Sequence, residues 1–341
     1  MKKILLLVAA IMVIGPATTL FADHAKLMPE NVGRVYLAPI YTSTSNVFND
    51  DGDRKGTTLG MEMWNVGFAW EHGVLSWMTA AIQWTPGYTV HSKVASLGEA
   101  TNVNDMGDVF VGAKIQVVGS TALVASDDMR IGIAPGLKVP LTKVDFKKEA
   151  EKFAGGNNDF TANRVDKHVL AAGGRLYFDY LFTKEFFVNF YNETIIYVQK
   201  GKLKNHDLIA GGAVLFGAAD SDVDYKYQLT FEIEPNYTLE FAPKTTIEFG
   251  LPISYVVNPA PDFNYSVADK AIIDVVGGVA GMSLSGTKKS EVVTVKPTVG
   301  LFFMYWPLPI EFKFAYFMPV WGKNANASNT MSAQVRVYYK I

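Results

Sequence analysis

The residue types that most often catalyse reactions or bind metals form no recognisable site in this sequence. Its five histidines are scattered, and none has the His-Glu-x-x-His spacing of zinc hydrolases. It contains neither a Gly-x-Ser-x-Gly turn nor a phosphate-binding loop. Asp50-Asp51-Gly52-Asp53 matches a fragment of a calcium loop but lacks the spaced ligands and terminal glutamate of a complete one. We therefore expect a protein that is not an enzyme and that uses no cofactor or metal.

Charged residues instead follow a regular alternation. Between Tyr225 and Phe241 the odd positions are apolar or aromatic apart from one proline, and the even positions are polar, including Glu232, Glu234 and Glu240. A period of two places the two sets on opposite faces of a β-strand. The same alternation puts these candidate lumen-lining residues on the polar faces of their strands: Asp108, Lys114, Arg130, Lys138, Arg175, Asp179, Glu232, Glu248, Glu311, Lys313 and Arg336. Facing charges of opposite sign can brace a barrel wall as ion pairs, and unpaired ones can set ion preference.

The N-terminus indicates export across a membrane. Two lysines precede an apolar run, and the segment ends in small residues at Ala22, which is the pattern of a signal peptide cleaved after that residue. We expect residues 1–22 to be the signal peptide, 23–32 a short periplasmic segment, and 33–341 the folded domain. The sequence has no cysteine, so neither disulfide bonds nor a lipid-anchored cysteine is available.

The remaining chain combines high hydrophobicity with the absence of a transmembrane helix pattern. Hydrophobic residues make up 49% of the sequence and aromatic residues 13%, yet no run after the signal peptide is long and apolar enough to form a spanning helix. The net charge of −2 gives no basic excess for nucleic acid. A membrane protein without spanning helices must be a closed barrel. We therefore predict an all-β fold, a closed antiparallel transmembrane β-barrel in the outer membrane of a diderm (Gram-negative-type) bacterium, with outer-membrane lipid and the barrel-assembly machinery as partners.

A soluble antiparallel sandwich would alternate as well. Aromatic residues near many strand ends favour the barrel, because membrane barrels carry aromatic girdles at both interfaces. The residues with this placement are Trp64, Trp70, Trp77, Trp84, Tyr177, Tyr180, Tyr197, Tyr255, Trp306 and Trp321. Short connections also alternate with long ones, as in outer-membrane barrels. The short ones are at 71–73, 183–184, 242–244 and 306–309, and the long ones at 44–57, 89–105, 141–167 and 258–291.

The sequence leaves two strand counts open. Thirteen segments have a strand pattern: 33–43, 58–71, 74–88, 106–118, 128–140, 168–181, 185–199, 206–217, 225–241, 244–257, 292–304, 310–321 and 330–341. Both termini on the periplasmic side require an even number. Splitting the long run at Pro235 gives 14 strands, because proline interrupts strands. Omitting the weak glycine-rich segment 206–217 gives 12 and keeps the run unbroken. We predict 14, with 12 as the alternative.

Three short motifs resemble a known group of outer-membrane proteins. The run from Asn104 to Lys114 (Asn-Asp-Met-Gly-Asp-Val-Phe-Val-Gly-Ala-Lys) resembles the glycine–aspartate strand opening of channels from aromatic-degradation pathways, which are relatives of the FadL-type transporters. Tyr36-Leu37-Ala38-Pro39 and Gly136-Leu137-Lys138-Val139-Pro140 are similar to the same group. The resemblance implies a monomeric barrel that passes hydrophobic small molecules, such as fatty acids or aromatic compounds.

One feature departs from that group. FadL-type proteins resemble one another in an N-terminal hatch that plugs the lumen, whereas residues 23–32 are too few for such a hatch. We therefore expect any plug to come from inward-folding loops, above all the loop at 141–167. It contains helix-forming residues followed by Gly155-Gly156, and a short amphipathic helix there would present a candidate capture site for hydrophobic molecules. Its apolar members are Val144, Phe146, Ala150 and Phe153. A solvated helix on the barrel rim is compatible with the same pattern.

The sequence thus favours a channel for hydrophobic small molecules. A structural or surface-interaction barrel without transport is the alternative, and its long loops would bind external partners. A general diffusion porin is a weaker alternative, because no long acidic constriction loop is evident.

Overall fold

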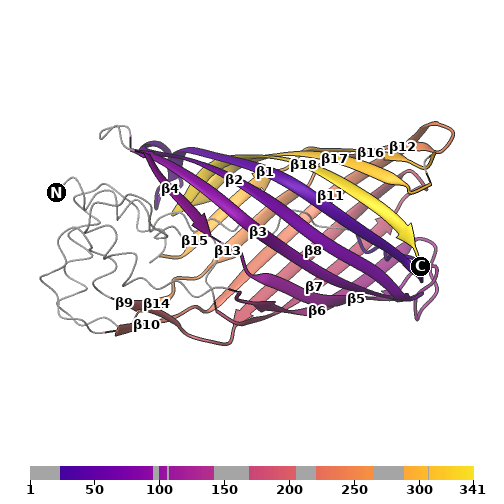
Figure 1. Cartoon of the computed structure of the whole chain (residues 1–341), viewed down its shortest axis with the longest axis horizontal. Coiled ribbons are helices and arrows are strands. Elements are labelled where there is room, and N and C mark those ends of the chain that lie inside the picture. Colours follow the sequence, from indigo (N-terminus) through magenta and orange to yellow (C-terminus); the bar gives the residue numbers. More distant parts are fainter. Residues whose placement is uncertain are drawn as a thin grey trace, which may run out of the picture.

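The alternating segments form a closed antiparallel β-barrel with strongly tilted strands (Figure 1). The computed structural model describes residues 24–94, 100–105, 107–141, 169–204, 220–263, 288–305 and 307–341. Within these residues the ring has 12 strands. Hydrogen bonds between β1 (Val32–Phe48) and β18 (Ala325–Lys340) close it, so the first and last strands are neighbours.

Hydrogen-bonded neighbours follow the chain order around the ring. From β1 the wall continues through β2 (Arg54–Leu75), β3 (Met78–Val94), β5 (Val109–Val118), β6 (Met129–Val139), β7 (Ala171–Leu181), β8 (Phe186–Tyr197), β11 (Tyr227–Ala242), β12 (Thr245–Gly250) with β13 (Ile253–Asn258), β15 (Ser290–Val295) with β16 (Thr298–Phe303), and β17 (Ile310–Lys323) before β18. The segments β12 and β13 are two halves of one wall strand, as are β15 and β16, because each pair lies end to end along the same neighbour.

Three prolines explain these interruptions. Pro235 in β11 lies opposite the break between β12 and β13, and Pro252 lies within that break. On its other side, the same break lies opposite Pro297, which separates β15 from β16. A proline has no N–H to donate to a neighbouring strand. The flanking residues keep the wall together, since Leu251 N donates to Pro235 O (3.1 Å) and Lys296 N donates to Pro252 O (2.8 Å).

The described residues form 12 wall strands and not the 14 that we predicted, so they agree with the alternative count. Pro235 does not split its strand, because β11 runs from Tyr227 to Ala242 without a turn. The carbonyl of Pro235 points to β12 and β13, so its missing N–H faces the existing gap in that neighbour and costs β11 no bond to β8. The segment 206–217 lies outside the described residues, and β8 pairs directly with β11, which leaves no place in the ring between them.

The two surfaces of the wall differ as the alternation predicts. Large apolar side chains are exposed on the outside of most wall strands, among them Leu37, Val111, Leu137, Leu176, Ile233, Leu239, Phe314 and Val335. The side chains between them point inward and are mostly polar and buried. A lipid-facing apolar band around a polar interior is the arrangement of outer-membrane barrels. In the described part of the chain, no helix is long and apolar enough to span a membrane.

The girdle prediction needs a correction at two positions. Trp64, Tyr180 and Trp321 are exposed on the outer surface, whereas Tyr177 and Tyr197 are buried and face inward. Trp306 lies outside the described residues. Ring size alone therefore does not tell which face of a strand an aromatic residue occupies.

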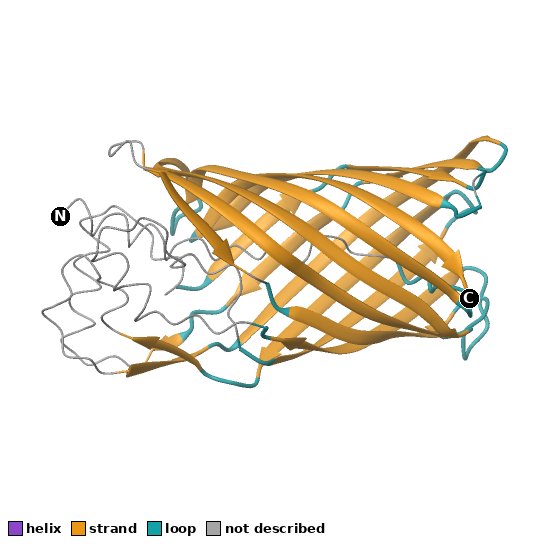
Figure 2. Ribbon diagram, viewed as in Figure 1, coloured by secondary structure: helices purple, strands orange, loops and turns teal. Residues whose placement is uncertain are grey.

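The two ends of the barrel are unequal. Figure 2 shows short turns at the end where the chain terminates, and the first of these lies at Ser76-Trp77, because β2 continues through the predicted turn at 71–73. At the opposite end, β4 (Ala100–Asp105) extends the pairing of β3. A separate 3-stranded sheet there combines β9 (Gly201–Lys204), β10 (Asp220–Asp224) and β14 (Asp262–Phe263).

Candidate functional site in the barrel lumen

The segment from His24 to Asn31 crosses the inside of the barrel. Asn31 lies beside Gly73 of β2, where its N–H donates to Gly73 O (2.9 Å). At the other end the His24 side chain contacts β11 and β12. These strands lie on opposite sides of the ring. The crossing segment, as residues 24–31 are called below, therefore spans the lumen from wall to wall.

Four wall strands, β2, β3, β5 and β7, hold the crossing segment through its backbone. Lys114 Nζ donates to His24 O (2.9 Å) and Gln116 Nε2 to Ala25 O (2.9 Å), both from β5. Met28 N donates to Thr79 Oγ1 of β3 (3.0 Å). These bonds go to main-chain atoms, so they fix the path of the segment whatever its side chains are.

Asp179 of β7 is the most buried of these anchors, with 0% exposure. Both of its carboxylate oxygens lie 3.2 Å from Ala25 N, which donates to them. Asn189 Nδ2 donates to Oδ1 (2.6 Å), and Arg130 forms an ion pair with Oδ2 (2.7 Å). A buried carboxylate needs such compensation, because an unpaired buried charge is costly. Asp179 thereby joins three elements, the crossing segment, β6 and β8.

Gly73 allows the crossing segment to approach the wall closely. A Cβ atom at this position would lie 2.1 Å from Pro29 O and 2.5 Å from Met28 O, distances that real Cβ atoms do not adopt. Only glycine removes that atom. The crossing segment can therefore contact β2 closely because Gly73 has no side chain.

His24 ends the described part of the crossing segment in an acidic surrounding. Its Nε2 lies 3.2 Å from Glu248 Oε1 and its Nδ1 3.9 Å from Glu234 Oε2. The imidazole also meets the Phe187 ring edge-on, with centroids 4.7 Å apart. These contacts join the N-terminal end of the segment to β8, β11 and β12.

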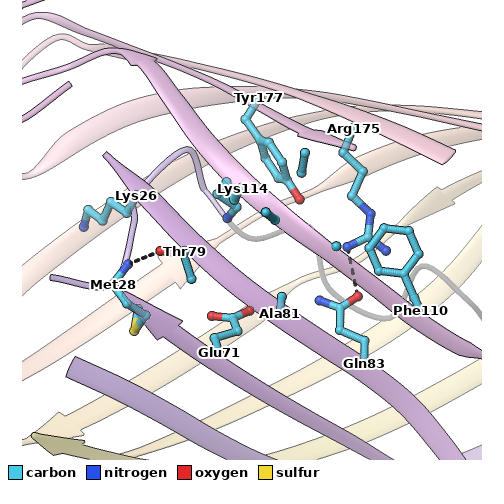
Figure 3. A pocket seen from close by; sticks show the side chains of 13 residues that line it. Lys26, Met28, Glu71, Thr79, Ala81, Gln83, Phe110, Lys114, Arg175 and Tyr177 are labelled. Atoms are coloured by element: carbon cyan, nitrogen blue, oxygen red, sulfur yellow. Dashed lines mark hydrogen bonds between the residues drawn. The ribbon is translucent and has the colours of Figure 1, made fainter. Parts of the chain in front are cut away.

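Beside the crossing segment, cationic and aromatic side chains alternate around a small cavity (Figure 3). The Arg175 guanidinium lies 4.1 Å from the Phe110 ring centroid, and Lys114 Nζ lies 4.3 Å from that of Tyr177. Arg175 also donates to Gln83 Oε1 (2.9 Å) and pairs with Glu193 (2.5 Å). The cavity has a volume of about 20 Å³, which is room for about one water molecule.

The 11 candidate lumen-lining residues all lie on the inner side of the wall, and eight of them pair with one another. Arg130 pairs with Asp179, Lys138 with Asp108 (3.8 Å), Lys313 with Glu248 (3.6 Å) and Arg336 with Glu311 (3.1 Å). Of the others, Lys114 binds the crossing segment, Arg175 pairs with Glu193, and Glu232 pairs with Lys296 (2.7 Å). Most of these pairs join adjacent strands, so they can brace the barrel wall as cross-strand ion pairs.

The expectation that a plug must come from the loops is wrong for this barrel, because the crossing segment itself occupies the lumen. Sequence reasoning missed His24, Gln116 and Thr79 as parts of this site. Eight residues without a periodic pattern give no signal, and the His24–Glu248 contact joins residues 224 positions apart. The predicted capture residues Val144, Phe146, Ala150 and Phe153 lie outside the described residues.

Comparisons with known proteins bear on the fold. No family model and no curated protein matches the sequence. An outer membrane channel from Pseudomonas putida F1 has a similar crystal structure, with a TM-score of 0.62, 10% sequence identity, and coverage of 94% of this chain and 100% of that chain. The transport unit of the autotransporter AIDA-I from Escherichia coli matches with a TM-score of 0.50, 7% identity, and coverage of 98% and 97%.

A FadL homologue from Pseudomonas aeruginosa also matches, at 10% identity over 97% of this chain and 95% of that chain, but its TM-score of 0.37 is too low to support an argument. At such low sequence identity, the similarity to the Pseudomonas putida channel and to the AIDA-I transport unit concerns the fold alone. The chain has the fold of an outer-membrane channel barrel.

Proposed function

We propose that this protein is a monomeric, non-enzymatic outer-membrane channel for hydrophobic small molecules, such as fatty acids or aromatic compounds. The observation that carries the proposal is the crossing segment, which closes the lumen through contacts with opposite walls. A barrel that is closed at rest and held by a few hydrogen bonds suits a channel that opens for particular solutes. A general diffusion porin needs an open aqueous lumen, and a segment that crosses the lumen from β2 to β11 and β12 argues against one.

Aromatic rings inside the barrel support a hydrophobic substrate. Phe110, Tyr177, Phe187 and Tyr191 are buried on the lumen side, next to the crossing segment. Each of the first three lies under a cationic group. An aromatic solute that replaces part of the crossing segment would meet ring faces and cations, so aromatic stacking and cation–π contacts are available to it.

The alternative is a barrel that does not transport. The observation in its favour is the set of cross-strand ion pairs, which brace the wall and fill the lumen. In that case the long loops would be the functional part, and the crossing segment would be a permanent part of the core.

Solute flux through reconstituted barrels distinguishes these functions. Purified protein in liposomes is expected to take up a labelled aromatic hydrocarbon or fatty acid faster than protein-free liposomes, while a hydrophilic sugar of similar size enters slowly. In planar bilayers the expected conductance is small, with brief openings. Equal fluxes of sugar and hydrocarbon with a large steady conductance would indicate a porin, and no flux of any solute would indicate the structural barrel.

A further inference from the structure

His24 of the crossing segment lies between two carboxylates, one at each nitrogen of its ring. Its Nε2 lies 3.2 Å from Glu248 Oε1, and its Nδ1 lies 3.9 Å from Glu234 Oε2. Glu234 is 0% exposed and neither of its carboxylate oxygens accepts a hydrogen bond, and the Nδ1 of His24 is also buried without a hydrogen bond. Among the described residues, His24 is the only ion-pair partner of Glu234, whereas Glu248 also pairs with Lys313 (3.6 Å).

A neutral imidazole cannot satisfy both carboxylates. It has one N–H and one lone pair. With the proton on Nε2, the lone pair of Nδ1 faces the Glu234 carboxylate, and with the proton on Nδ1, the other lone pair faces Glu248. One additional proton removes the conflict, and it can reside on the ring, which then donates from both nitrogens, or on Glu234, whose O–H then points to Nδ1. In either case the three side chains together bind one proton more than a neutral ring and two carboxylates.

The other charged groups around His24 do not supply this proton. They come from five wall strands and from the segment itself: Glu232 of β11, Lys313 of β17, Arg130 of β6, Asp179 of β7, Lys114 of β5 and Lys26. Glu232 pairs with Lys296, Arg130 with Asp179, and Lys313 with Glu248. Lys114 Nζ donates to the His24 carbonyl oxygen, and Lys26 Nζ lies 5.5 Å from the Phe187 ring centroid. None of these described cations lies within ion-pair distance of Glu234.

We propose that His24, Glu234 and Glu248 form a proton-binding site that holds the N-terminal end of the crossing segment against β11 and β12. When the proton is lost to water at alkaline pH, the neutral ring and the buried Glu234 carboxylate no longer attract each other, so this end of the segment detaches and Glu234 becomes hydrated. The inference goes beyond the proposed function, because it concerns the position of the segment and requires no solute.

The direction of the pH effect follows from the proton count. The seated segment binds one proton more than the detached one, in which a neutral His24 and an ionised Glu234 are each solvated separately. A rise in pH therefore favours detachment, by up to about tenfold for each pH unit when one proton is released. A fall in pH favours the seated position until the carboxylates themselves become protonated.

The remaining anchors of the segment do not titrate in this way. Thr79 and Gln116 bind it through a hydroxyl and an amide. Asp179 is compensated by Arg130 and by Asn189, which donates to it. At the other end, the bond from Asn31 N to Gly73 O joins two main-chain atoms. A change in pH thus acts on the His24 end and leaves the Asn31 end attached to β2.

Hydrogen exchange tests the proposal on exported protein in detergent. The exchange rates of amides in the crossing segment are measured by mass spectrometry from about pH 5 to about pH 9, which covers the range in which histidine side chains ordinarily change charge. Each rate is divided by the intrinsic rate at the same pH. Ala25 N and Met28 N donate to Asp179 and Thr79 in the seated segment, so their protection reports detachment. We expect wild-type protection to fall by up to about tenfold for each pH unit over part of this range, while the amides of β7 stay protected.

Two variants identify the residues that share the proton. His24→Gln keeps a polar side chain that does not titrate, so the segment should be less protected than wild type at low pH and its protection should not change with pH. Glu234→Gln removes the carboxylate that requires the additional proton. Its protection should also change little with pH, but it should stay high at alkaline pH, where wild type has lost protection. If His24 only packs against Phe187, His24→Gln lowers protection by the same factor at every pH, and that result would overturn the proposal.

Two further variants are matched controls that should keep the wild-type pH profile. His72→Gln removes a histidine on the face of β2 that also carries the exposed Trp64 and Val66. Lys26→Arg keeps a charge on the segment that cannot be lost, since guanidinium stays protonated in proteins. Wild-type protection that does not vary with pH, or a pH profile that disappears in Lys26→Arg, would refute the assignment to His24.

Solute flux at the same pH values is a separate measurement. A segment that detaches at alkaline pH in a barrel that passes no solute would refute the proposed channel function and support the proton-binding site. Flux of hydrophobic solutes together with protection that is independent of pH would have the opposite meaning.

Discussion

Replacing Gly73 by alanine is expected to open the lumen. The new Cβ would stand 2.1 Å from Pro29 O and 2.5 Å from Met28 O, so the backbone of the crossing segment must move away from β2. That movement breaks the hydrogen bonds from Asn31 N to Gly73 O and from Met28 N to Thr79 Oγ1. At about 1 kcal/mol net for each bond, the seated position loses about 2 kcal/mol, which favours displacement about thirtyfold.

Single-channel recording measures this shift directly. The Gly73→Ala barrel should spend about thirty times more time open than wild type while openings remain rare, because the ratio of displaced to seated segment changes by that factor. Gly132→Ala is the matched control, since Gly132 is also a lumen-side wall glycine, but its Cβ would meet no heavy atom closer than 3.6 Å. An unchanged open fraction in a folded Gly73→Ala barrel would refute the idea that the crossing segment closes the channel.

Three further outcomes are expected. Lys296→Met leaves the Glu232 carboxylate buried without its 2.7 Å partner, so the free energy of unfolding should fall by about 3–5 kcal/mol. The double variant with Glu232→Gln should recover most of that loss in urea titrations, and an equally unstable double variant would contradict the pairing argument. At the rim, the hydrogen bond from Lys288 lowers the pKa of Asp50 below its usual 3.8. The stabilisation from this exposed tie is therefore present above that value and lost as the pH falls through the lower folded pKa, so Asp50→Asn should flatten the acid dependence of unfolding slightly. Deletion of 144–154 should weaken uptake of hydrophobic solutes into vesicles while the barrel stays folded, and unchanged uptake would exclude a capture role for that loop.

The barrel itself could be predicted from the sequence because alternation is a local property. Each strand shows which of its faces is polar, so the inward direction of residues such as Arg130 and Glu311 follows from phase alone. The partner of each charge is a matter of register, which depends on neighbouring strands. Arg130 stands opposite Asp179 and Glu311 opposite Arg336, and no local pattern shows this.

Pro235 illustrates how local rules can mislead. A proline within a strand pattern indicates a break when that strand is considered alone. In the barrel, the adjacent wall strand is interrupted beside Pro235, between β12 and β13. The missing N–H of Pro235 therefore leaves no acceptor of a continuous ladder without its hydrogen bond. The crossing segment could not be predicted for a related reason, since its hydrogen bonds join its main-chain atoms to side chains on distant strands.

The row formed by Pro235, Pro252 and Pro297 makes the wall mechanically uneven. Elsewhere the hydrogen-bond ladder resists bending, whereas along this oblique line three adjacent strands each lack a donor. The Lys296–Glu232 ion pair spans the same line from inside. A barrel squeezed or stretched by a change in bilayer thickness should therefore flex along this line first, and the strands on either side should move as stiff panels about a hinge.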